Sequence, residues 1–270
     1  MHTQTLTANA ITETNLFTLQ HLLPDWIDIM NKKTLGVIGG LGPIATAHFM
    51  ELVIKMTDAQ TDQEHLDMII YNSPSIPDRT SYILDNTKPN PLPQIIEIGK
   101  ALSEQKSGFI AIPCITAHYF HKELQKEIST PIINIVEETV KHLKENGVSK
   151  VGIMATDGTI SAGLFQKELR DNGMEAIIPS PDRQKDVMSL IYDCVKADKP
   201  VDTEIFNRVK NELSEKGAET TILGCTELSL IKRDYEIGAG FIDAMEVLAQ
   251  QAVLKCGAQI KDEYRNLITK

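Results

Sequence analysis

The chain has 270 residues, of which 42% are hydrophobic and 24% charged, and its formal net charge is -10. The length suffices for one large domain or two smaller ones, each with a buried core. The acidic balance argues against sequence-independent nucleic-acid binding, and no apolar run approaches the roughly 18 residues that span a membrane. Because the first residues, MHTQTLTANAITETNLF, lack the basic and apolar regions of a secretory signal, we expect a cytoplasmic protein.

From Lys33 onward, short apolar strands alternate with amphipathic helices. The first half predicts strands at 34–40, 66–72, 108–113 and 131–136, and helices at 43–60, 91–106, 116–128 and 137–147. The second half predicts strands at 150–156, 175–179, 219–224 and 240–243. It predicts helices at 160–173 and 182–197, another helix that ends at 216, and a last one at 244–257. This alternation predicts an α/β fold of mainly parallel sheets flanked by helices.

The two halves of this pattern repeat one another. When Gly36 is aligned with Gly152, strand, turn and helix fall into register, and PSIPDR at 74–79 matches PSPDR at 179–183. We therefore expect two pseudo-symmetric domains with a site in the cleft between them. The expected boundaries are 33–138 plus 243–270 for the first domain and 139–242 for the second. Residues 1–32 are interpreted as an N-terminal extension, either packed on the body or a partner, or only partly ordered.

The four cysteines form no C-x-x-C pair, so neither a structural zinc site nor a disulfide framework is expected. Cys114 in FIAIPCITAH and Cys225 in TILGCTELS follow short strands at equivalent points of the repeat, and each begins a predicted helix. Open α/β sheets bind ligands at the carboxyl ends of their strands, where both cysteines are expected. A helix N-terminus also stabilises a thiolate. Cys194 and Cys256 lack this context and are interpreted as structural.

A glycine-rich turn follows the first strand. GLGPIA at 40–45 fits a dinucleotide-binding fingerprint, but no acidic residue closes the second strand. We therefore favour a turn whose glycines, Gly40 among them, let the backbone approach a small ligand, while the following helix offers N–H groups to an anion.

Two facing thiols suit two kinds of chemistry. Disulfide exchange typically uses C-x-x-C, which is absent. The alternative is proton transfer on both faces of one carbon: a thiolate removes a proton, and the opposite thiol returns one, which inverts a stereocentre. An ordinary thiol pKa of about 8.5 lies close enough to neutral pH for both roles.

Several short motifs carry a resemblance to a known family: GVIGGLGP at 36–43, PDR at 77–79, PCITAH at 113–118, ATDGT at 155–159 and GCTE at 224–227. Together they resemble the cofactor-independent aspartate/glutamate racemase family, and most closely its aspartate racemase branch. The resemblance covers residues 33 to 260 and leaves out the N-terminal extension.

The resemblance implies two α/β domains with the site between them, no pyridoxal phosphate and no metal. It implies that Cys114 and Cys225 are the catalytic acid–base pair, with Cys114 serving the D-enantiomer and Cys225 the L-enantiomer. It also implies that Arg79 and a lysine, Lys196 or less well Lys185, bind the substrate's carboxylates. Read without the resemblance, Arg79 could be a surface residue of a turn and Lys196 a solvated charge at a helix end.

Other polar side chains are candidates for hydrogen bonds to the substrate, although they could instead satisfy strand ends or helix caps: Asn72, Thr116, Thr156 and Thr226. His118, four residues after Cys114, could tune the thiol or pack as an ordinary core histidine.

The chain departs from the family at Ile115, where an asparagine commonly follows the first cysteine. Because an apolar side chain cannot supply an amide contact, the substrate or the rate is expected to differ. The predicted function is racemisation of a small-molecule acidic amino acid, aspartate before glutamate. The alternatives are isomerisation, decarboxylation or racemisation of another small carboxylate on the same fold, or small-carboxylate binding without turnover. A homodimer is compatible with such a fold.

Overall fold

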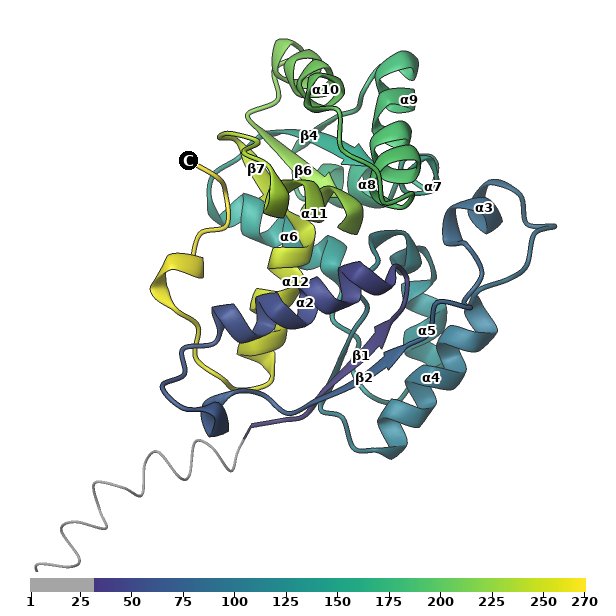
Figure 1. Ribbon diagram of the computed structural model, residues 1–270, viewed down its shortest axis with the longest axis vertical. Helices are drawn as coiled ribbons and strands as arrows, with labels where there is room; N and C mark the ends of the chain where they lie inside the picture. The colour runs from purple at the N-terminus through teal and green to yellow at the C-terminus, as the bar shows by residue number, and fades with distance from the viewer. Residues whose placement is uncertain (1–31) are drawn as a thin grey trace, which may run out of the picture. The chain divides into compact units, whose positions relative to one another are not determined.

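The computed structural model describes residues 32–270, so the extension predicted for residues 1–32 lies outside the described residues except for Lys32. Residues 33–270 form one compact unit that contains two parallel sheets (Figure 1). The first sheet has the order β2-β1-β3, with strands β1 (Leu35–Gly39), β2 (Met68–Asn72) and β3 (Phe109–Ala111). The second has the order β5-β4-β6-β7, with β4 (Lys150–Ala155), β5 (Glu175–Ile177), β6 (Thr220–Gly224) and β7 (Phe241–Asp243).

The topology repeats as the sequence predicts. The order β2-β1-β3 recurs as β5-β4-β6, and every strand pair within the sheets is parallel. Gly36 and Gly152 lie in β1 and β4, which both have strand neighbours on two sides. The predicted α/β class with two related sheets is therefore confirmed.

Helices connect the strands and cover the sheets. The α-helices are α2 (Pro43–Met56), α3 (Arg79–Leu84), α4 (Leu92–Glu104), α5 (His121–Glu127), α6 (Ile135–Glu145), α7 (Asp157–Ser161), α8 (Leu164–Asp171), α9 (Pro181–Ser189), α10 (Thr203–Glu215), α11 (Thr226–Asp234) and α12 (Ala244–Lys255). Short 3₁₀ turns are η1 (Asp62–Glu64), η2 (Ile115–Phe120) and η4 (Asp262–Tyr264), and η3 (Leu190–Val195) is a π-helix.

The structure corrects three predicted elements. Residues 131–136 are not a strand: Ile132 bridges β3 at Ile110 alone, and the Asn134 side chain then caps α6 by accepting from Val136 N and Glu137 N. The helix predicted at 160–173 is divided between α7 and α8 by Gly163, whose φ of 66° is left-handed. The helix predicted at 116–128 begins as the 3₁₀ turn η2.

The two sheets share one central core. Leu35 and Val37 of β1 belong to the same buried cluster as Val151 and Ile153 of β4. The helix α12 supplies much of this cluster and packs against α2 and α6. Each sheet also has an outer cluster of its own, with α4 and α5 on the first sheet and α9 and α10 on the second. The strands β1, β4 and β6, which have strand neighbours on two sides, are buried on both faces almost throughout, and this burial accounts for their largely apolar sequences. No helix among residues 32–270 is long and apolar enough to cross a membrane.

Candidate active site

A narrow cavity lies between the two sheets, where segments following β1, β3, β4 and β6 converge. It is lined by Leu41, Asp78, Arg79, Thr80, Cys114, Ile115, Thr116, Thr156, Tyr192, Lys196, Cys225, Thr226 and Glu227. Both halves of the repeat therefore contribute side chains to one space, as the sequence predicts for a site in a cleft.

Cys114 is held at the start of η2, three residues beyond the end of β3. Its backbone is extended, and its side chain is buried. Its carbonyl accepts from Ala117 N at 3.1 Å, which closes the first turn. The His118 ring lies behind this turn, with Nδ1 3.0 Å from the Cys114 carbonyl and Nε2 3.2 Å from the Ile133 carbonyl. His118 therefore braces the backbone of Cys114 and does not line the cavity.

Cys225 occupies the equivalent place in the second half. It has an extended backbone at the N-terminus of α11, directly after β6, and it is as buried as Cys114. Its thiol donates a hydrogen bond to Glu227 Oε2 at 2.8 Å. Burial and the neighbouring Glu227 carboxylate raise the pKa of the Cys225 thiol well above its usual value, although Lys196 opposes them. This environment keeps Cys225 protonated.

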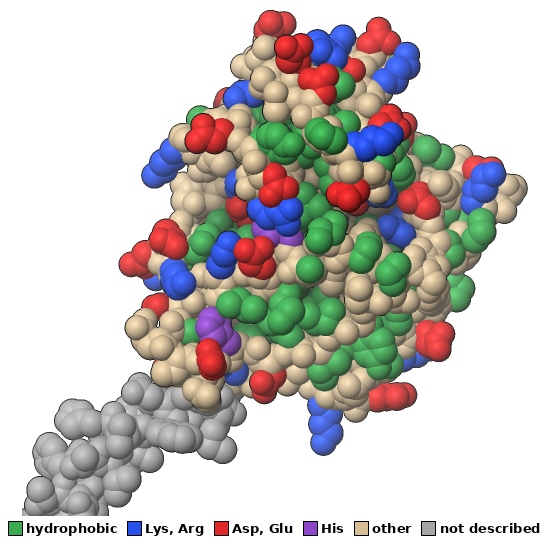
Figure 2. Space-filling model, in the orientation of Figure 1, with side chains coloured by type: hydrophobic (Ala, Val, Ile, Leu, Met, Phe, Trp, Pro, Cys, Tyr) green, Lys and Arg blue, Asp and Glu red, His purple; other side chains and the backbone are tan. Residues whose placement is uncertain are grey.

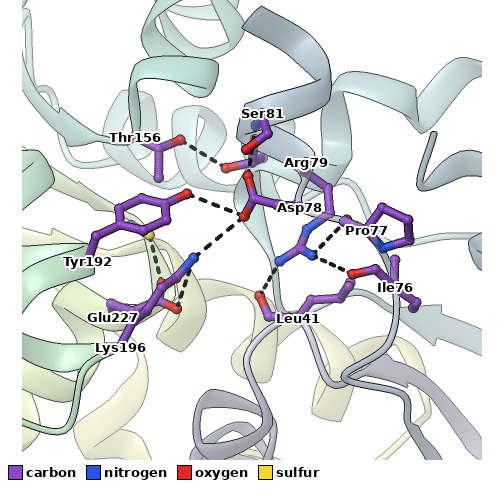
Figure 3. A network of polar contacts seen from close by, with 12 residues as sticks. Leu41, Ile76, Pro77, Asp78, Arg79, Ser81, Thr156, Tyr192, Lys196 and Glu227 are labelled. Atoms are coloured by element: carbon purple, nitrogen blue, oxygen red, sulfur yellow. Dashed lines mark hydrogen bonds and ion pairs between the residues drawn. The ribbon is translucent and has the colours of Figure 1, made fainter. Parts of the chain in front are cut away.

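Arg79 begins α3 and is buried, so it is not the surface residue of a turn. Its guanidinium donates to three backbone carbonyls, those of Ile76 at 3.3 Å, Pro77 at 3.0 Å and Leu41 at 2.9 Å (Figure 3). Burial lowers the pKa of Arg79, but Cys114, Asp78 and Glu227 outweigh it, so the pKa lies above its usual value. The Nε atom is buried without a partner. Arg79 thus places positive charge beside Cys114 with part of its donor capacity unspent.

Lys196 reaches the cavity from the other half, directly after the π-helix η3. Its ammonium lies 4.0 Å from the centre of the Tyr192 ring, 3.9 Å from Asp78 Oδ2 and 4.0 Å from Glu227 Oε1 (Figure 3). Burial lowers the pKa of Lys196, but Glu227, Cys225, Tyr192 and Asp78 outweigh it, so the pKa is raised and Lys196 is a cation. Lys185, the less favoured alternative, lies on the surface and pairs with Asp182 at 3.0 Å.

Asp78 connects the two halves across the cavity. Its Oδ1 accepts from Ser81 N at 2.7 Å and caps α3, while its Oδ2 accepts from the Tyr192 hydroxyl at 3.4 Å. Burial raises the pKa of Asp78, but the Ser81 N–H, Lys196 and Arg79 outweigh it, so the pKa is lowered. Asp78 is therefore an anion that faces Lys196.

Three threonine hydroxyls join the halves at another point. The hydroxyl of Thr116 lies 3.1 Å from those of both Thr156 and Thr159, and all three residues are buried. Thr116, Thr156 and the equally buried Thr226 line the cavity, and their contacts with a substrate stay a prediction.

Two of the predicted contact residues lie elsewhere. Gly40 lines a wider outer cleft that shares Leu41, Asp78, Arg79, Lys196 and Glu227 with the cavity. Its φ is 89°, and a Cβ would lie 2.4 Å from the Ser73 backbone, so the glycine is needed for close packing of two loops. Asn72 is the exposed last residue of β2 and lines neither space.

Ile115 also lines the cavity, although its side chain belongs to the central core and is 1% exposed. No polar group replaces the amide that the family commonly has at this position. Hydrogen bonds to a ligand must therefore come from neighbouring hydroxyls, from charged side chains and from backbone groups.

Sequence reasoning did not assign roles to Glu227, Tyr192 or Asp78, which all line the cavity. Glu227 and Asp78 stand inside the recognised motifs GCTE and PDR, so their proximity to Cys225 and Arg79 was a usable signal. Tyr192 carries no such signal, because the π-helix that places it beside Lys196 is not visible in the sequence. Within residues 32–270, no group of three His, Cys, Asp or Glu side chains is arranged to hold a metal ion.

Comparison with known proteins agrees with this geometry. The chain matches the family described as Asp/Glu/hydantoin racemase over residues 38–252. The family match and the two related α/β halves identify the chain as a member of a racemase family, and racemases are isomerases. The chain belongs to the Asp/Glu/hydantoin racemase family, so the family and the enzyme class predicted from the sequence are confirmed.

Individual relatives cover most of the chain. The broad specificity amino-acid racemase RacX of Bacillus subtilis is 29% identical over 225 residues, which are 81% of this chain and 96% of RacX. The glutamate racemase of Limosilactobacillus reuteri is 27% identical over 252 residues, which are 88% of this chain and 87% of the relative. The solved structure of Picrophilus torridus aspartate racemase superposes with a TM-score of 0.77 at 33% identity, and covers 87% of this chain and 99% of that chain.

Proposed function

We propose that the protein racemises an amino acid by proton transfer between Cys114 and Cys225, without a cofactor. The observation that carries the proposal is the position of the two thiols, which line one cavity from equivalent strand ends of two repeated halves. Inversion at a carbon needs a base on one face and an acid on the other, and a pseudo-symmetric pair of thiols can serve as both.

In one direction, the Cys114 thiolate takes the α-proton and becomes a thiol, while the electrons of the C–H bond delocalise into the substrate's carboxylate. The Cys225 thiol then gives its proton to the opposite face of the α-carbon and becomes a thiolate. The raised pKa of Cys225 keeps the thiol protonated, so that it holds the proton to be given, and Arg79 supplies positive charge beside Cys114. The reverse reaction exchanges the two roles. Glu227, which accepts from the Cys225 thiol, is placed to receive or return that proton.

For the substrate, we propose aspartate first and glutamate second. The proposal is supported by relatives that are named aspartate racemase and glutamate racemase. It is also supported by two cations at the cavity, Arg79 and Lys196, which can face carboxylates, and by Asp78 and Glu227, which can face the ammonium group.

Ile115 favours a second candidate, racemisation of an amino acid or another small carboxylate without an acidic side chain. Its apolar side chain offers no hydrogen bond at a position where the family commonly has an amide. A relative named as a broad specificity amino-acid racemase agrees with a wider substrate range.

The test is a racemase assay on purified protein without added cofactor. D- and L-aspartate, D- and L-glutamate and a panel of neutral and basic amino acids are incubated, and both enantiomers are measured by chiral chromatography. Cys114→Ala and Cys225→Ala should each abolish turnover, while Cys256→Ala, which removes a buried thiol outside the cavity, should retain it. Turnover by either cavity variant at the rate of the unmodified protein would contradict the two-thiol mechanism. Tight binding without turnover by the unmodified protein would instead support a small-carboxylate-binding protein.

A further inference from the structure

The outer cleft adjoins the catalytic cavity and has room for more of a substrate than its reacting atoms. Its volume is about 670 Å³, which lies within the range of about 300–1,000 Å³ usual for small-molecule sites. Five residues line both the cleft and the cavity, so a side chain can extend from one space into the other. The residues that line the cleft alone therefore bear on which side chains the protein accepts.

The walls that belong to the cleft alone are mostly apolar, and both halves of the molecule contribute to them. Ile76 belongs to the outer buried cluster of the first sheet, and Val195 packs against that of the second. Pro74 adds to this surface, as do Pro43 and Ile44 in the first turn of α2. Figure 2 shows apolar side chains gathered over α2 near the middle of the view. Such walls favour an aliphatic chain, because contact with them removes apolar surface from water.

Asp198 is the single charged residue, among those that the structure describes, that lines the cleft and not the cavity. Its side chain makes no hydrogen bond or ion pair within residues 32–270, and Lys199, the next residue, does not line the cleft. The φ of Asp198 is 53°, a left-handed value that only one other non-glycine residue of this part of the chain, Lys106, adopts. Non-glycine residues in this conformation cluster at ligand sites. The turn after η3 thus offers a carboxylate whose oxygens are free to accept from a ligand.

Carboxylates outnumber cations along the outer cleft. The charged residues that it shares with the cavity are balanced, because Arg79 and Lys196 are matched by Asp78 and Glu227. The Lys196 ammonium lies 3.9 Å from Asp78 Oδ2 and 4.0 Å from Glu227 Oε1 (Figure 3). Asp198 adds one negative charge that no other residue lining the cleft offsets. A side chain with a positive charge complements this balance.

We propose that the protein also racemises amino acids whose side chain is an aliphatic stem that ends in a cation, as in lysine, ornithine and arginine. The α-carbon lies between Cys114 and Cys225, and the stem extends into the outer cleft. There the stem packs along Ile76 and Val195, and its terminal ammonium or guanidinium pairs with Asp198. This inference rests on the proposed racemisation, and it gives the second candidate, a substrate without an acidic side chain, a definite chemistry.

Norleucine separates the stem from the charge, because it has an unbranched aliphatic side chain like that of lysine but no ammonium at its end. Racemisation of L-lysine, L-norleucine and L-aspartate by purified protein is followed by chiral chromatography. The kcat/KM for lysine should exceed that for norleucine by about tenfold. Lysine turned over no faster than norleucine would overturn the inference. Turnover of aspartate without turnover of lysine would also overturn it and leave the proposed racemisation standing. No turnover of any of the three would contradict that racemisation itself, and this inference with it.

Substitution of the carboxylate provides a second test. Asp198→Asn keeps the size of the side chain and tolerates the left-handed backbone, but it removes the charge. The ratio of kcat/KM for lysine to kcat/KM for norleucine should fall by about tenfold in this variant. Asp193→Asn, which removes an exposed carboxylate of η3 that lines neither space, should keep the original ratio. Thermal unfolding establishes that both variants are folded. An unchanged ratio in folded Asp198→Asn would overturn the pairing of the substrate's cation with Asp198.

Discussion

The buried ring of His118 makes a specific prediction about stability and pH. Burial lowers the pKa of this ring from 6.5 to about 4, and the neighbouring His121 adds to the effect. The neutral ring has a single N–H, so it donates to only one of the two carbonyls that it faces, those of Cys114 and Ile133. A protonated ring could donate to both carbonyls, but it would place a positive charge in a fully buried position.

The sign and size of the effect follow from the two pKa values. Between pH 6.5 and 4 the unfolded chain binds a proton at His118 and the folded protein does not, so stability falls as the pH falls. At about 1.4 kcal/mol for each pH unit, His118 removes about 3 kcal/mol from the free energy of unfolding across this window. Above pH 6.5 its contribution is constant.

Urea unfolding at a series of pH values from 7.5 to 4 measures this directly. In His118→Gln the fall in the free energy of unfolding between these limits should be smaller than in the unmodified protein by about 3 kcal/mol. Tyr119→Phe changes an exposed neighbour in the same turn and should keep the original pH dependence. An unchanged pH dependence in His118→Gln would refute the assignment of a buried, neutral ring.

Three further substitutions test the cavity and its walls. Burial and the Glu227 carboxylate together raise the Cys225 pKa, and Glu227→Gln removes the second cause. The limb of the pH–rate profile that follows ionisation of the Cys225 thiol should therefore move to lower pH, and an unmoved limb would contradict this role of Glu227. Arg79→Lys replaces the planar guanidinium fork with a compact ammonium, which lacks the two spaced nitrogens that reach the carbonyls of Ile76, Pro77 and Leu41. Urea unfolding should show a loss of about 1–3 kcal/mol, and an unchanged free energy of unfolding would contradict the structural role of the fork. Gly158→Ala puts a Cβ 2.9 Å from Thr80 Cα and should lower the free energy of unfolding by about 1–3 kcal/mol. An unchanged urea midpoint would mean that α3 and α7 can move apart without cost.

The sequence predicts the sheets and the thiol pair well, because both depend on local signals. Apolar runs bounded by glycine or proline mark the strands, and the repeat places Cys114 and Cys225 at matching strand ends. The false strand at 131–136 shows the limit of this reasoning. An apolar run there resembles a strand, but Asn134 begins a helix instead, and only Ile132 meets the sheet.

Contacts across the cavity are not visible in the sequence, because they depend on how the halves pack. Arg79 reads as a residue in a turn but is buried at the start of α3, where its two terminal nitrogens donate to backbone carbonyls and its Nε has no partner. Tyr192 meets Asp78 across more than a hundred residues of chain, and a π-helix sets its direction. Asn72 ends a strand like a ligand-binding residue, yet β2 is an edge strand and its end is exposed.

Racemisation in deuterated water tests the two-thiol mechanism most directly. Early in the reaction of either enantiomer of aspartate, the product should carry deuterium at the α-carbon, while the remaining substrate keeps its protium. This asymmetry follows because one thiol removes the substrate's proton and the opposite thiol delivers a proton that has equilibrated with solvent. Equal early labelling of the substrate and product pools would mean that a single group serves both faces, and would contradict the paired roles of Cys114 and Cys225.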